Sequence, residues 1–130
     1  MDDRQHALNS ATLILGSLDN LTGLVMAGKN LDVTNAGAIN NQGGELSSQG
    51  IVTVRTDSLD NRSKGTVAAN GKLLVTATGK VNNADQGLIA SRSAGVELKA
   101  ASLDNAKGTL QGKGLVTVEL SWNKLQQCDF

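Results

Sequence analysis

A short string that returns at nearly fixed spacing is the feature that most constrains how this chain folds. Leu-Asp-Asn occurs three times, and the related Ile-Asn-Asn and Val-Asn-Asn lie between those copies. The strings end at Asn20, Asn41, Asn61, Asn83 and Asn105, which are spaced 21, 20, 22 and 22 residues apart. A period of this length predicts a repeat architecture, in which each supersecondary unit buries its apolar face against the next.

Aliphatic residues keep step with the asparagines through all five copies. One aliphatic residue lies two positions before each asparagine, a glycine lies three or four after it, and another aliphatic residue lies two past the glycine. A pair of aliphatic residues with one residue between them follows. These pairs are Leu31/Val33, Val52/Val54, Leu73/Val75, Val96/Leu98 and Val116/Val118. The repeat therefore has four aliphatic columns.

The spacing inside each repeat is that of strands. Leu31-x-Val33 and Val96-x-Leu98 alternate as half-buried strands do. Gly, Asn, Ser and Thr are too dense for a helix of useful length. The sequence predicts an all-β parallel β-helix, or solenoid, of about five to six rungs of 20–22 residues, with three short strands per rung. A leucine-rich repeat fits less well, because it requires the asparagine three residues after a leucine.

The recurring asparagines are expected to have a structural role. Stacked in register, Asn20, Asn41, Asn61, Asn83 and Asn105 predict a ladder of side-chain amide hydrogen bonds along the axis. Asparagine also tolerates the left-handed backbone that a corner requires. Contact with a ligand is the alternative, which is less favoured for these five residues.

The residues before the asparagines alternate between acid and amide: Asp19, Asn40, Asp60, Asn82 and Asp104. We expect this alternation to space the charges and to place an amide donor between carboxylates. Calcium binding is disfavoured, because the nine-residue calcium-binding repeat is absent. Acid/base catalysis by paired carboxylates is disfavoured too, since these residues are the repeat itself rather than a local departure from it.

One outward column on the first strand of each repeat is predicted to hold Thr34, Arg55, Thr76, Lys99 and Glu119. Lys99 and Glu119 would then be cross-strand neighbours worth a few tenths of a kcal/mol, about 0.2–1 kcal/mol at most.

Composition narrows the possible functions. Twelve basic and twelve acidic residues give a net charge of zero, so no overall field attracts nucleic acid or an anionic membrane. Aromatic residues make up only 2% of the chain, and the single cysteine excludes an internal disulfide framework. No catalytic, metal-binding or cofactor-binding residue is expected. His6 has no triad partner at a known spacing, Cys128 is interpreted as a bystander thiol, and Trp122 could cover the last rung.

The predicted organisation is an N-terminal lead-in or partial rung at 1–10, β-helix repeats at 11–120 and a C-terminal tail or cap at 121–130. The first residues show no signal-peptide pattern, so a secreted protein containing this chain would be longer.

The Leu-Asp-Asn string, the following glycine and the L-x-V strand resemble the repeats of the filamentous haemagglutinin family of two-partner-secretion exoproteins. Residues 58–65 and 102–108 carry the resemblance best, and it covers about residues 11–120. The resemblance implies a right-handed β-helix in a fibre on the bacterial surface, exported through an outer-membrane partner. It also implies roles in attachment, aggregation or the delivery of toxins, including contact-dependent inhibition toxins, through a host-cell or bacterial-surface receptor or glycan.

Three functions follow as hypotheses. The first is a non-enzymatic structural and interaction segment of a secreted, cell-surface adhesin. The second is a segment that binds a glycan or receptor with its own specificity. The third, a polysaccharide lyase or hydrolase, is disfavoured by the scarcity of aromatic platforms for sugars.

Overall fold

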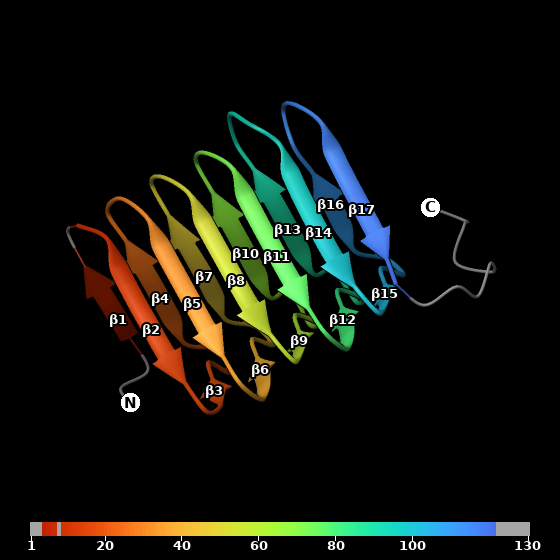
Figure 1. Ribbon diagram of the computed structural model, residues 1–130, viewed down its shortest axis with the longest axis horizontal. Coiled ribbons are helices and arrows are strands. Elements are labelled where there is room, and N and C mark those ends of the chain that lie inside the picture. The colour runs from red at the N-terminus through yellow and green to blue at the C-terminus, as the bar shows by residue number, and fades with distance from the viewer. Residues whose placement is uncertain (1–3, 8, 122–130) are drawn as a thin grey trace.

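The chain forms a single right-handed parallel β-solenoid of about five turns. The computed structural model describes residues 4–7 and 9–121. Figure 1 shows two sheets of long strands facing each other, with the short strands of a third sheet along one side. All strand pairs within the described residues are parallel. The predicted fold class is confirmed.

Each turn contributes one strand to each sheet. Sheet A contains β1 (Arg4–Ala7), β4 (Leu24–Ala27), β7 (Glu45–Ser48), β10 (Thr66–Ala69), β13 (Leu88–Ser91) and β16 (Thr109–Gln111). Sheet B contains β2 (Ala11–Leu15), β5 (Leu31–Asn35), β8 (Val52–Thr56), β11 (Leu73–Ala77), β14 (Val96–Ala100) and β17 (Val116–Leu120). Sheet C contains β3 (Leu18–Asp19), β6 (Ala38–Asn40), β9 (Ser58–Asp60), β12 (Lys80–Asn82) and β15 (Ser102–Asp104).

The register places equivalent repeat positions directly over one another. In sheet B, Val33 pairs with Val54, and Val54 pairs with Val75. In sheet C, the residues before each asparagine pair in the same way. The three strands predicted for each repeat therefore correspond to one strand in each of the three sheets.

The core is a stack of aliphatic side chains inside the coil. The four predicted columns supply its large fully buried side chains, including Leu31, Leu46, Leu59 and Val75, each at most 2% exposed. Strands of sheet B alternate buried and less buried positions, as the period of two requires. In the last rung Leu103, Leu110, Val116 and Val118 are only partly buried, because no further rung of the described chain covers them.

Several of the long strands end in a small or polar residue whose side chain is buried inside the coil. Ala27, Ser48, Ala69 and Ser91 end the strands of sheet A and are buried. At the ends of two sheet B strands, Asn35 and Thr56 are buried and hydrogen-bonded to each other at 3.2 Å. These corners combine small side chains with buried polar groups, of which the Oδ1 atom of Asn35 has no hydrogen-bond partner among the described residues.

Candidate functional site

The predicted asparagines lie in one continuous row at the corner between sheets C and A. Each of the first four donates its side-chain amide to the side-chain oxygen of the next. The four distances are 2.7 Å (Asn20 to Asn41), 2.7 Å (Asn41 to Asn61), 2.8 Å (Asn61 to Asn83) and 2.8 Å (Asn83 to Asn105). We call this row the Asn ladder. The first four members are at most 4% exposed.

Each donor of the Asn ladder also bonds the backbone of sheet A. The same amides reach the carbonyls of Glu45, Thr66, Leu88 and Thr109, at 2.9–3.1 Å. Both amide hydrogens are therefore used inside the fold. Four of these side chains hold the corner together and have no donor left for a ligand.

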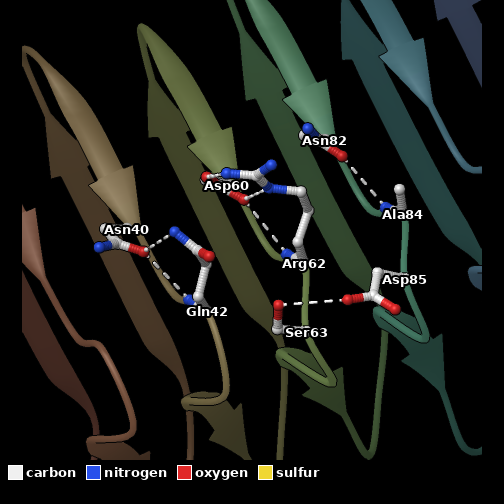
Figure 2. Close-up of polar contacts among 8 residues, drawn as sticks. All are labelled: Asn40, Gln42, Asp60, Arg62, Ser63, Asn82, Ala84 and Asp85. Carbon is white, nitrogen blue, oxygen red and sulfur yellow. Dashed lines mark hydrogen bonds and ion pairs between the residues drawn. The ribbon is translucent and has the colours of Figure 1, made fainter.

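The residue immediately before each ladder asparagine forms a hydrogen bond within its own turn and not with its counterpart in the next rung. The Oδ1 atom of Asp19, Asn40, Asp60, Asn82 and Asp104 accepts a backbone N–H two residues later, at 3.1–3.3 Å. This is the Asx-turn pattern, and Figure 2 shows three of its members. The described part of the chain contains no hydrogen bond between neighbours in this column. The predicted spacing of the charges is present, because the register places Asn40 and Asn82 between the aspartates, but their amides do not hydrogen-bond to them.

The corner after each asparagine contains left-handed backbone, but the asparagine does not adopt it. Corners with two residues before the glycine hold one positive φ, at Thr22, Gly43 or Lys107. Corners with three hold two, at Ser63 and Lys64 or at Asp85 and Gln86. The predicted left-handed role of the asparagines is corrected: within the described residues they show no positive φ, because their side chains must face inward to stack.

The glycines that follow these turns are required by close approach. A Cβ on Gly65 would lie 2.6 Å from the Oδ1 atom of Asn61 and 2.8 Å from its carbonyl oxygen. A Cβ on Gly87 or Gly108 would overlap a carbonyl oxygen of the preceding rung. The glycine column therefore makes room for the Asn ladder.

The surface of this corner carries one well-formed ion pair. The guanidinium of Arg62 contacts both carboxylate oxygens of Asp60 at 2.9 Å, as Figure 2 shows. This hydrogen bond, with the charge of Asp60, raises the pKa of Arg62 above its ordinary value. Ser63 contacts Asp85 of the next rung at 3.4 Å. The arrangement is exposed and its partners are already satisfied, so it offers no group for acid/base work.

The outward column of sheet B is placed as predicted, with Lys99 paired in register with Glu119. The carboxylate nearest to Lys99, however, is Glu97 at 3.3 Å, and Glu97 also lies 3.9 Å from Lys72. The ion pair follows the same strand and not the neighbouring one, because Glu97 and Lys99 project from the same face.

The remaining candidate residues add no site. The backbone of His6 pairs with Met26 in sheet A, while Trp122 and Cys128 lie outside the described residues. Across residues 4–7 and 9–121, no three His, Cys, Asp or Glu side chains are grouped so as to hold a metal ion. The same stretches contain no helix long and apolar enough to span a bilayer.

A groove of about 600 Å³ runs across the outer face of sheet A. Its floor includes Ser47, Ala68 and Ala90, which follow one another in register on β7, β10 and β13. Glu45 lines one part of it, and Arg92 and Lys113 line another. Small side chains on successive rungs produce the hollow. The hollow was not predicted from the sequence, although the outward column of Ser and Ala is a sequence signal for it.

Fold and corner together define a class of protein, a solenoid of parallel β repeats closed by an internal amide ladder. The sequence profile of the haemagglutinin repeat matches residues 7–85 and 68–119. This chain belongs to the haemagglutinin repeat family, whose members occur in secreted surface adhesins and are generally non-enzymatic. Neither the search of curated proteins nor that of solved structures gave a match.

Proposed function

We propose that this chain is a segment of the shaft of a secreted adhesin-like exoprotein on the bacterial surface. The observation that carries the proposal is the continuity of the coil. Three parallel ladders and one Asn ladder pass through the rungs without interruption. A stiff, repetitive rod suits attachment, aggregation or the presentation of a toxin, with contacts to a receptor or glycan made by the longer protein.

Export through an outer-membrane partner is part of this proposal. A coil whose rungs contact mainly their neighbours needs no distant segment in order to close. Such a chain can cross a membrane extended and fold rung by rung outside, and membership of a family of surface adhesins supports that route.

The proposal includes no catalysis in this segment. Among the described residues, the aspartates that precede the ladder asparagines accept hydrogen bonds within Asx turns. Asp60 also forms an ion pair with Arg62. Turnover of a polysaccharide by the purified chain, abolished by Asp60→Asn, would contradict this part of the proposal.

Surface labelling tests the location. Antibodies raised against the purified chain should label intact producing cells as strongly as lysed ones. Deleting the gene for the outer-membrane partner should confine the label to lysed cells. Label seen only after lysis in the unmodified cells would contradict the proposal, and a cytoplasmic protein stained in parallel shows that intact cells exclude antibody.

A further inference from the structure

Charge is distributed unevenly along the groove on sheet A. At one end, Arg92 and Lys113 each lie two residues past the register pair Ala90 and Gln111, so they occupy adjacent rungs. Adjacent rungs are about 4.8 Å apart. Arg92 and Lys113 have no carboxylate partner within the described residues, a property that they share with Lys29, Arg55, Lys64, Lys80 and Lys107, but they are the two basic residues that line the groove. Two uncompensated cations side by side favour an anion.

The other end of the groove has the opposite sign. Glu45 lies on β7, and its carboxylate accepts a hydrogen bond from Ser47 at 2.8 Å. From β7 to β16 there are three steps between neighbouring strands, or about 14 Å. Between these ends, Thr66 and Asn70 supply a hydroxyl and an amide group beside the small residues of the floor, and the amide of Gln111 lies on β16 at the basic end. A ligand that fits is elongated, neutral along most of its length and anionic at one end.

The groove lies on a sheet face, which decides between two kinds of elongated ligand. The backbone groups of β7, β10 and β13 are already paired within sheet A. A peptide laid on this face would find no strand edge for its own N–H and C=O groups, which is how extended peptides gain affinity. A saccharide instead presents hydroxyls that match hydroxyl and amide side chains. The described lining contains no aromatic residue, so a neutral sugar lacks the stacking that would hold it.

We propose that the groove on sheet A binds a short oligosaccharide with an acidic sugar at one end. The acidic group lies against Arg92 and Lys113, and the neutral sugars extend toward Glu45. The volume of about 600 Å³ is within the range of small-molecule sites. This inference deepens the proposed function, on which it rests, by naming a ligand class for the surface of the shaft.

Calorimetric titration with matched ligands tests the proposal. Sialyllactose, which ends in a carboxylate, should bind the full chain, and lactose should bind at least about tenfold more weakly. Lactose carrying a terminal sulfate distinguishes the source of the anion: binding shows that charge suffices, and its absence shows that the carboxylate is read. A short alanine peptide ending in glutamate should not bind.

Variants locate the site. Arg92→Gln and Lys113→Gln should each weaken sialyllactose binding by about tenfold, and Lys80→Gln, an exposed cation on sheet C, should leave it unchanged. Ala68→Leu fills the floor and should abolish binding, whereas Ala38→Leu on the outer face of β6 should not. Strand content measured by circular dichroism checks that every variant is folded.

Equal binding of lactose, binding of the peptide, no binding of sialyllactose, or an equal loss in Lys80→Gln would each overturn the inference. These outcomes are separate from surface labelling. Labelled cells with no sugar binding reject the groove alone, whereas sugar binding by a chain that stays inside the cell rejects the proposed function alone.

Discussion

The side chain of Asn61 shows how much the fold depends on single residues of the Asn ladder. It accepts a bond from Asn41, donates to Asn83 and reaches the carbonyls of Gly65 and Leu88, while being fully buried. A buried polar group left without its partner costs about 1–3 kcal/mol. Any substitution here disturbs partners on both sides, so its effect exceeds that of one lost hydrogen bond.

Asn61→Asp replaces the side-chain NH2 group, a hydrogen-bond donor, with a carboxylate oxygen, an acceptor, in a side chain of nearly equal shape. We expect a loss of about 3 kcal/mol or more in unfolding free energy at pH 7, because an uncompensated charge becomes buried. Burial raises the pKa of the new carboxyl above its unfolded value of about 3.9. The folded state then binds the proton more tightly, so the variant loses stability as pH rises above about 4 and recovers it below.

Urea unfolding across this pH range measures the effect. Asn70→Asp is the matched control, because Asn70 is exposed, and its stability should differ little from that of the unmodified chain. Equal losses in the two variants, or a pH-independent loss in Asn61→Asp, would show that the ladder amide is dispensable.

Three glycines differ in why, or whether, the fold requires glycine at their positions. Gly43 has a φ of 63°, Gly65 faces Asn61, and a Cβ on Gly16 would meet nothing within 4 Å. We expect Gly43→Ala to cost about 1–2 kcal/mol from left-handed backbone, and Gly65→Ala about 3 kcal/mol from overlap with the ladder. Gly16→Ala should be neutral or stabilise by about 0.4–1 kcal/mol. Thermal unfolding ranks the three, and any other order contradicts the structure.

At the scale of the strands, sheet B carries an exposed row of charges whose effect on stability is small. Glu97 lies between Lys72 and Lys99, and the three side chains are 32–53% exposed. Exposed ion pairs contribute about 0.2–1 kcal/mol, and salt screens them. The outer face of this sheet can therefore vary in sequence without loss of the coil, provided that the inward positions keep their aliphatic side chains.

Glu97→Lys should lower the unfolding free energy by less than about 1 kcal/mol at low salt, because three cations then adjoin. Added salt should reduce the loss. Glu119→Lys should have a smaller effect, since Glu119 makes no ion pair within the described residues despite its register with Lys99. Denaturant unfolding at two salt concentrations compares the two variants. A larger loss in Glu119→Lys would contradict the structure and support the cross-strand pair of Lys99 and Glu119 that the sequence predicted.

The strands and the core were predictable because burial on a strand has a period of two and the repeat exposes that period five times. Val33, Val54 and Val75 align in sequence and in space for the same reason. The turns were less predictable. Thr22 and Ser63 adopt left-handed φ without belonging to the residue types that favour it. The geometry of the coil requires left-handed backbone at these corners, and the conformational preferences of the residues do not predict it.

The partners of the ladder asparagines were predictable, but those of the residues before them were not. An aspartate before an asparagine could bridge to the next rung or bond its own turn, and only the geometry of the corner selects the second. Likewise the groove depends on the relative sizes of Ser47, Ala68 and Ala90 and of their flanks across rungs. The groove is formed by several repeats together, so the pattern of a single repeat does not predict it.

At the scale of the whole molecule, each rung is exchangeable with its neighbours. Deleting residues 62–83 removes β10, β11 and β12 and joins Asn61 to the corner that begins at Ala84. We expect the shortened chain to retain its strand signal and a cooperative, somewhat less stable unfolding transition, because stability sums over rungs and their interfaces.

Deleting only residues 62–72 should instead abolish the transition, since the strands that follow would then occupy the wrong sheets. Circular dichroism and thermal unfolding of both variants make the comparison. A folded chain after the shorter deletion, or an unfolded one after the longer, would contradict the exchangeability of the rungs.

The constant spacing of the ladder has a kinetic consequence. Each partner in the Asn ladder is 20–22 residues away in the chain. The entropy of closing a loop depends on its length, so every new rung forms by closing a loop of the same size. Once a first rung exists, growth proceeds by equal steps, and a longer array takes more steps without making any one of them slower.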